Sequence, residues 1–170
     1  HTIGRRQRQM CIRDRSSLLA SITNANPKIA NYQFTTLNPN LGVASYDNKE
    51  ITIADIPGLV EGAHKGTGLG IQFLKHIERC KSLLHLIDIT SEDLKKSYQQ
   101  VKNELKKYSN KLTKKKELIV LNKIDLIDEK EVNYIIKDFK KNTKSEVIAL
   151  STFNKSSVSK IKSKLLNYVS

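Results

Sequence analysis

The chain has 170 residues, of which 38% are hydrophobic, and this is enough for a globular protein with a buried core. Its net charge of +13 would suggest nucleic-acid binding, but five arginines and one aspartate in residues 1–15 contribute +4 of that charge. No apolar run approaches the roughly 20 residues that a membrane-spanning helix needs, so a membrane protein is excluded and a cytoplasmic protein is expected.

Along the chain, segments whose apolar residues have the spacing of a helix alternate with short apolar runs typical of strands. The first helix is predicted to begin near Ser16, because Leu18, Leu19 and Ile22 fall on one face. Strands are predicted at 50–56, 82–89, 117–125 and 145–151, the last three as near-continuous apolar runs, and further helices near 69–80, 91–109, 128–142 and 155–169. This alternation predicts an α/β fold with a mostly parallel sheet and helices on both faces.

Two further features complete the general description. The lysine-rich stretch 94–116 has apolar residues at a helical period with lysines opposite, and two interpretations of these lysines stay open: a solvated helix surface, or a surface that binds RNA directly. Cys11 and Cys80 lack the paired spacing of a zinc site or a disulfide framework, and we expect buried or free thiols.

The most informative loop is "NKID", which follows the predicted strand at 117–125. Ligands bind beyond the carboxyl ends of parallel strands, so this loop is placed to meet a ligand. The Asp125 carboxylate can accept both N1–H and the amino hydrogens of guanine, which adenine does not offer. Asn122 would hold the purine edge and the neighbouring loop, and the stem of Lys123 could lie over the base.

A second loop, "DIPG", follows the predicted strand at 50–56. Asp55 at the strand end can reach a magnesium ion through a water molecule, and the backbone N–H of Gly58 can approach a terminal phosphate. Taken alone, the motif could also be a simple turn. Upstream, Thr35 or Thr36 could complete the metal shell with a hydroxyl group.

The stretches "NPKIANYQFTTLNPNLGV", "ADIPGLVEGAHKGTGLGIQFLKHIERCKSLLHLID" and "NKID" resemble the GTPase domain of the Obg family, which comprises bacterial ribosome-associated GTPases. The resemblance runs from about Ser16 to the C-terminus. It implies that Thr36 ligates magnesium, that 34–38 line the nucleotide and that 55–58 approach the γ-phosphate. The backbone loop on the guanine side would be 151–153, where Thr152 stands in place of the more usual alanine.

The resemblance also implies where the phosphate loop should lie. Arg15, Ser16 and Ser17 fall where the family has lysine, serine and threonine, but the glycines that let this loop turn around phosphates are absent from residues 1–15. We therefore expect 1–15 to be a non-family segment, foreign to the fold, and 16–170 to be the GTPase domain of a P-loop NTPase-like fold whose first strand and P-loop are lost. From the resemblance we also expect that the domain preceding the GTPase unit in the family is not part of this sequence.

These inferences give one set of expected site residues. The GTP-binding residues are Ser16, Ser17, Phe34, Thr35, Thr36, Leu37, Asn38, Asp55, Ile56, Pro57, Gly58, Asn122, Lys123, Ile124, Asp125, Ser151, Thr152 and Phe153, and the Mg²⁺ ligands among them are Ser16, Thr36 and Asp55. Leu59 follows "DIPG" and cannot orient water as a glutamine would, so no catalytic residue is assigned.

The implied function is that of a GTP-binding, Mg²⁺-dependent switch domain that hydrolyses GTP. The partners implied are GTP and GDP for this chain, and the large ribosomal subunit or its rRNA for the parent protein, acting in large-subunit assembly; a monomer is expected. Two alternatives stay open. A fragment without its phosphate loop would have no measurable GTP affinity, and a basic RNA-binding module would explain the charge but neither "NKID" nor "DIPG".

Overall fold

The computed structural model describes residues 16–23, 28–29, 40–55, 78, 80–152 and 154–169. The chain divides into two compact units, each described by itself. The first unit comprises His1–Tyr32, Leu37–Pro57 and Thr152–Ser170, and the second comprises Gln33–Thr36 and Gly58–Ser151.

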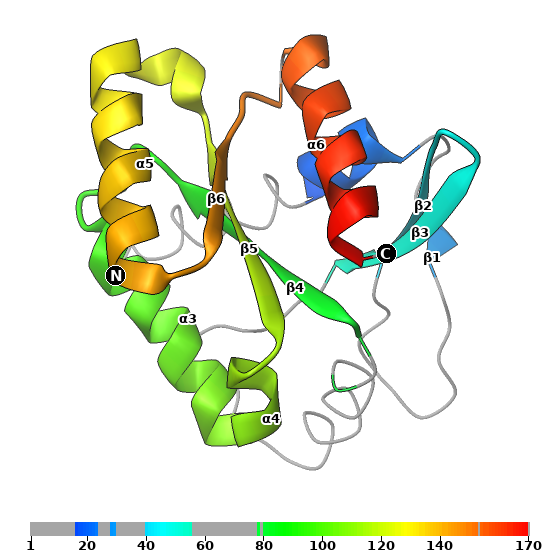
Figure 1. Ribbon diagram of the computed structural model, residues 1–170, viewed down its shortest axis with the longest axis horizontal. Coiled ribbons are helices and arrows are strands. Elements are labelled where there is room, and N and C mark those ends of the chain that lie inside the picture. The colour runs from blue at the N-terminus through cyan, green and yellow to red at the C-terminus, as the bar shows by residue number, and fades with distance from the viewer. Residues whose placement is uncertain are drawn as a thin grey trace. The chain divides into compact units, whose positions relative to one another are not determined.

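The second unit contains a parallel three-stranded sheet (Figure 1). Its strands are β4 (Ser82–Asp88), β5 (Lys116–Asn122) and β6 (Glu146–Ala149), in the order β4-β5-β6. Strand β5 lies in the middle, and its residues 117–122 are all buried. The three apolar runs predicted as strands of a parallel sheet are therefore confirmed, although β4 and β6 are mostly half-buried, and the chain has the expected α/β architecture.

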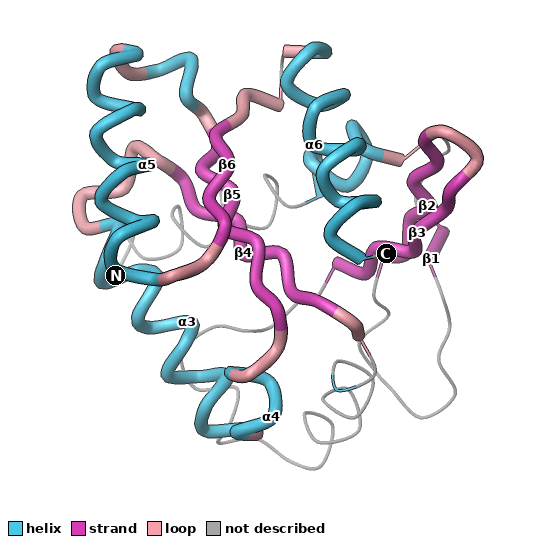
Figure 2. The backbone as a smooth tube through the Cα atoms, viewed as in Figure 1, coloured by secondary structure: helices cyan, strands magenta, loops and turns pink. Residues whose placement is uncertain are grey.

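Helices α3 (Leu94–Tyr108) and α5 (Glu129–Thr143) pack against this sheet, and both lie on the same side of it (Figure 2). Their apolar faces meet alternate residues of the strands in one core cluster, whose buried members are Ile87, Ile89, Tyr98, Ile119, Leu121, Val132, Phe139 and Val147. Two short elements connect the larger ones: α4 (Asn110–Thr113) before β5 and the 3₁₀ turn η2 (Ile124–Leu126) after it. The predicted helices near 91–109 and 128–142 are confirmed.

The first unit is built around an antiparallel sheet of β1 (Lys28–Ile29), β2 (Asn40–Tyr46) and β3 (Lys49–Asp55). A tight turn joins β2 to β3, and both of its residues, Asp47 and Asn48, have positive φ angles of 51° and 58°. Such a turn matches the twist of a hairpin and suits aspartate and asparagine. Strand β3 was predicted, whereas the hairpin was not, because β2 shows no clear alternation of apolar and polar residues.

Two helices belong to the same unit. The helix at 16–22 buries Leu18, Leu19 and Ile22, at 3%, 3% and 1% exposure, so the predicted apolar face is confirmed. Helix α6 (Lys155–Val169) packs on β2 and β3, and the predicted helix at 155–169 has these same limits. Gly42 in β2 lies against the end of the 16–22 helix: a Cβ atom there would overlap Cγ2 of Thr23.

The predicted helix near 69–80 lies outside the described residues, except for Glu78 and Cys80. The backbone carbonyls of these two residues accept hydrogen bonds from the Lys115 ammonium group. Cys80 is half-buried and forms no disulfide bond with a described residue, and burial raises the pKa of its thiol. Among the helices in the described part of the chain, none is long and apolar enough to cross a membrane.

Candidate functional site

The predicted base-binding loop begins where the buried strand β5 ends. Asn122, the last residue of the strand, is 2% exposed, and its Oδ1 atom has no hydrogen-bond partner among the described residues. The chain then turns sharply, because Lys123 has a φ of 68°, in the left-handed region. Asp125 follows in the 3₁₀ turn η2 with its side chain exposed. The loop thus presents a carboxylate at the surface and a buried amide at its base.

Strand β6 ends beside this loop. The backbone N–H of Leu150 donates to the carbonyl of Leu121 at 2.9 Å, and the N–H of Ile124 donates to the carbonyl of Leu150 at 3.4 Å. Ile124 packs against the core cluster, and Ser151, the next residue after Leu150, is buried. The structure therefore brings the predicted Ser151 next to the loop that carries Asn122 to Asp125. Thr152 is half-buried and belongs to the first unit.

One residue of this region was missed by the sequence analysis. Asp88, the last residue of β4, forms an ion pair with Lys123, with 2.6 Å between Asp88 Oδ2 and Lys123 Nζ. Burial raises the pKa of Asp88, but its hydrogen bonds to Lys123 and Thr90 outweigh burial and hold the pKa below its ordinary value. The signal was present, because Asp88 ends the strand adjacent to β5, and parallel neighbours end at the same edge of a sheet.

The predicted metal ligands of the first unit also lie together. The Ser16 hydroxyl donates a hydrogen bond to Asp55 Oδ2 at 3.2 Å, although the two residues are 39 positions apart in sequence. Asp55 ends β3 and is 8% exposed. A hydroxyl and a carboxylate side by side are the kind of oxygen groups that surround Mg²⁺, directly or through a water molecule. Ser17, also predicted, is exposed on the same helix.

Several predicted residues lie outside the described residues, so their placement remains a prediction. They are Phe34, Thr35, Thr36, Leu37, Asn38, Ile56, Pro57, Gly58 and Phe153. Within the described ranges, no three His, Cys, Asp or Glu side chains form a group that could hold a metal ion by themselves.

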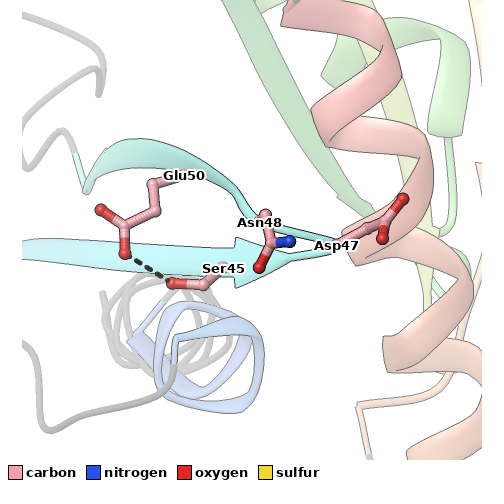
Figure 3. Close-up of a pocket in the computed structure, with 4 residues that line it drawn as sticks. All are labelled: Ser45, Asp47, Asn48 and Glu50. Carbon is pink, nitrogen blue, oxygen red and sulfur yellow. Dashed lines mark hydrogen bonds between the residues drawn. The ribbon is translucent and has the colours of Figure 1, made fainter.

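A surface pocket lies at the β2–β3 turn, apart from the predicted site residues. Ser45, Asp47, Asn48 and Glu50 line it, and the Ser45 hydroxyl donates to Glu50 Oε1 at 3.1 Å (Figure 3). Figure 3 shows the Asp47 side chain pointing away from the Ser45–Glu50 pair. These polar side chains follow from the turn itself, and we assign the pocket no role.

A buried polar cluster lies at the other end of β5, at its amino-terminal edge. Glu117 accepts hydrogen bonds from the Tyr98 hydroxyl at 3.0 Å and from the Lys102 ammonium group at 3.1 Å, and its other oxygen lies 3.2 Å from His85 Nδ1. Burial raises the pKa of Glu117, but His85 and Lys102 outweigh burial and lower it to about 2. Burial and the Glu117 charge raise the pKa of Tyr98. This cluster anchors α3 to the sheet.

Comparisons with known proteins identify the family. A family model described as "50S ribosome-binding GTPase" matches residues 15–123, which is more than half of the chain. The chain belongs to this family. The match begins at residue 15, next to the predicted boundary between the N-terminal segment and the GTPase domain.

The family's Obg members are similar to this chain over most of its length, so the predicted resemblance is confirmed. GTPase Obg of Pelagibacter ubique is 73% identical over 156 residues, which are 92% of this chain and 48% of that protein. GTPase Obg of Rickettsia felis is 51% identical over 147 residues, which are 86% of this chain and 44% of that protein. The chain thus spans about half the length of these relatives.

Solved structures show the same fold at low sequence identity. The cytosolic domain of the Thermotoga maritima FeoB iron transporter in its GMPPNP form has a TM-score of 0.66 and 18% identity, with 91% of this chain and 59% of that chain covered. Nucleolar GTP-binding protein 1 of Plasmodium falciparum has a TM-score of 0.61 and 21% identity, with 91% and 79% covered. The expected P-loop GTPase fold is therefore confirmed.

Proposed function

We propose that this chain binds guanine nucleotides through the loop from Asn122 to Asp125. The observation that carries the proposal is the arrangement of this loop: a carboxylate is exposed on a turn that a buried strand, an ion pair and a backbone hydrogen bond hold in place. The Oδ1 atom of Asn122 is buried and has no hydrogen-bond partner among the described residues, so it would be available to a further donor. Membership of a GTPase family supports the same assignment.

Mg²⁺ is the proposed cofactor, with Ser16, Asp55 and Thr36 as the residues that would hold it. The hydrogen bond between Ser16 and Asp55 supports the proposal, because it sets two oxygen donors of suitable chemistry side by side. When bound, the ion would neutralise charge on the β- and γ-phosphates. Ser17, 34–38, 55–58 and 151–153 remain proposed nucleotide contacts.

GTP hydrolysis is the proposed activity of the whole protein. Phosphoryl transfer depends mostly on positioning and charge neutralisation, so a water molecule placed in line with the leaving group would suffice. Leu59 has no polar group that could orient this water. Backbone groups near Gly58 would then take that role, which is why we assign no catalytic side chain.

We propose that residues 1–15 do not form a phosphate-binding loop. They contain a single glycine, Gly4, whereas a phosphate cradle needs a chain that can turn tightly with its N–H groups pointing inward. Asp14 would also repel an anionic ligand. GTP affinity of the chain as it stands is therefore expected to be weak.

The large ribosomal subunit, or its rRNA, is the proposed partner of the whole protein, which we expect to be cytoplasmic and monomeric. The lysine-rich stretch 94–116 supports an RNA contact, because it holds nine lysines and one glutamate. Lys106, Lys107, Lys111 and Lys114 are exposed where α3 meets α4, whereas Leu105 and Leu112 are buried beneath them. The lysines also stabilise the end of α3, so the helix alone accounts for part of their presence.

The proposal of guanine binding is tested by NMR on the 170-residue chain. Millimolar GDP with Mg²⁺ is expected to shift the amide signals of 122–126 and 150–151, whereas ADP at the same concentration should shift them much less. Because Asp125 accepts from two guanine donors that adenine lacks, replacement by asparagine should remove the difference between GDP and ADP. Equal shifts with the two nucleotides in the unsubstituted chain would refute guanine recognition.

A further inference from the structure

We propose that Asp88 is a positioning residue for the guanine-binding loop, and that it acts by holding the side chain of Lys123. The inference rests on the proposed function, since it concerns how the loop from Asn122 to Asp125 is prepared for a base. Asp88 itself lies on another strand and is not expected to contact the nucleotide. Its role would be to fix one member of the loop before a ligand arrives.

Strand pairing places Asp88 beside the loop. Strands β4 and β5 are parallel neighbours, and their register aligns Asp88 with Asn122. The backbone N–H of Ile89 donates to the carbonyl of Asn122 at 3.1 Å, so the two strands stay paired up to the residue where the loop begins. Lys123, one position beyond, therefore starts within reach of the Asp88 carboxylate.

The carboxylate of Asp88 is itself held in one orientation. Its Oδ1 atom accepts two hydrogen bonds from Thr90, at 3.0 Å from the backbone N–H and 2.7 Å from the hydroxyl. The other oxygen, Oδ2, is thereby left to face Lys123 Nζ at 2.6 Å. Both side chains are mostly buried, at 15% and 16% exposure, and a charge pair shielded from water is stronger than one in solvent.

Lys123 is the residue of the loop that most needs such support. Its φ of 68° is a left-handed conformation, which a residue with a Cβ atom adopts at an energetic cost. The hydrogen bond from the Ile124 N–H to the Leu150 carbonyl holds the backbone just after Lys123. The ion pair with Asp88 holds the Lys123 side chain. Neutralising Asp88 should therefore loosen the loop without removing any proposed nucleotide contact.

The test compares Asp88→Asn with a matched control, Asp138→Asn. Asparagine keeps the size of Asp88 and an acceptor for Thr90, and removes the charge that holds Lys123. Asp138 forms an ion pair with Lys95 at 2.9 Å on the surface of the same unit, so its replacement removes the same charge from an Asp–Lys pair that is more exposed and lies away from the loop. Two quantities are measured in each variant: amide hydrogen exchange at 123–126, and GDP affinity from NMR shifts at millimolar GDP.

In Asp88→Asn we expect exchange at 123–126 to become faster and GDP binding weaker, each by about fivefold, which corresponds to about 1 kcal/mol. Asp138→Asn should change neither quantity. In a Lys123→Ala background, Asp88→Asn should have no further effect on GDP affinity, because the residue through which it acts is gone.

Two outcomes would overturn the inference: GDP affinity unchanged in Asp88→Asn, or an equal loss in the Lys123→Ala background. A merely structural role of Asp88 would give that equal loss, together with lower global stability. Failure of the proposed function is recognised separately, because the unsubstituted chain would then show no GDP-dependent shifts at all.

Discussion

Replacement of Glu117 by glutamine tests how much the buried cluster at the amino-terminal edge of β5 stabilises the second unit. The side chain of Glu117 is 4% exposed, and His85, Tyr98 and Lys102 surround it. Its pKa falls from 4.5 to about 2 on folding. A shift of this size corresponds to about 3 kcal/mol of stability that depends on the ionised form. Glutamine resembles the neutral form, so its cost at neutral pH should be about 2–4 kcal/mol.

The pH dependence follows from the direction of this shift. Because the pKa of Glu117 is lower in the folded state, the unfolded chain takes up the proton first as the pH falls. Its stabilising contribution is therefore complete above pH 4.5 and is lost between there and about pH 2. Urea unfolding at a series of pH values, followed by circular dichroism, should show the two proteins converging in acid. A constant difference at every pH, or none at neutral pH, would refute the role given to the ionised carboxylate.

Three further predictions concern other parts of the chain. In a version with a restored glycine-rich phosphate loop, Asp125→Asn should shift preference from guanine to xanthine nucleotides, whose C2 carbonyl suits an amide donor; unchanged selectivity in competition binding would reject the assignment. In the same version, Leu59→Ala should slow GTP hydrolysis far less than Thr36→Ala, as single-turnover rates would show. Gly42→Ala should destabilise the first unit by about 1–3 kcal/mol, because the new methyl group would overlap Thr23; an unchanged urea midpoint would contradict this packing.

The parallel sheet and its helices could be predicted because local patterns determine them. Residues 118–121 form an apolar run typical of a strand buried on both faces, and α3 and α5 each have one apolar face. The β2–β3 hairpin was missed because β2 lacks alternation and the turn, Asp47-Asn48, carries no glycine. Its pairing depends on contacts with the 16–22 helix and α6, which the sequence does not display.

Some residues of the candidate site could be predicted from the sequence and others could not. Asn122 and Asp125 are recognisable because their motif is contiguous, and Ser16 could be linked to Asp55 through the family pattern. Asp88 and Glu117 were not foreseen. Asp88 meets Lys123, 35 residues away, and Glu117 meets Lys102 and His85, 15 and 32 residues away. These contacts arise only when β4 and β5 are paired in register and α3 packs against them. The place of Asp88 at a strand end indicates the edge of the sheet at which it lies, but the sequence does not identify the side chain that it meets there.

The most direct test of the whole account is the affinity for a fluorescent GDP analogue of two proteins: the chain as it stands, and the same chain with 1–15 replaced by an apolar strand and a glycine-rich phosphate loop. The central claim is that the base-binding loop is present and that 1–15 do not provide the phosphate cradle. Three lost charge-assisted hydrogen bonds of about 1.5–3 kcal/mol each would weaken binding by roughly three to six powers of ten. We predict affinity no better than high micromolar for the chain as it stands, and much tighter binding after the replacement. Equal submicromolar affinity of the two proteins would contradict the claim.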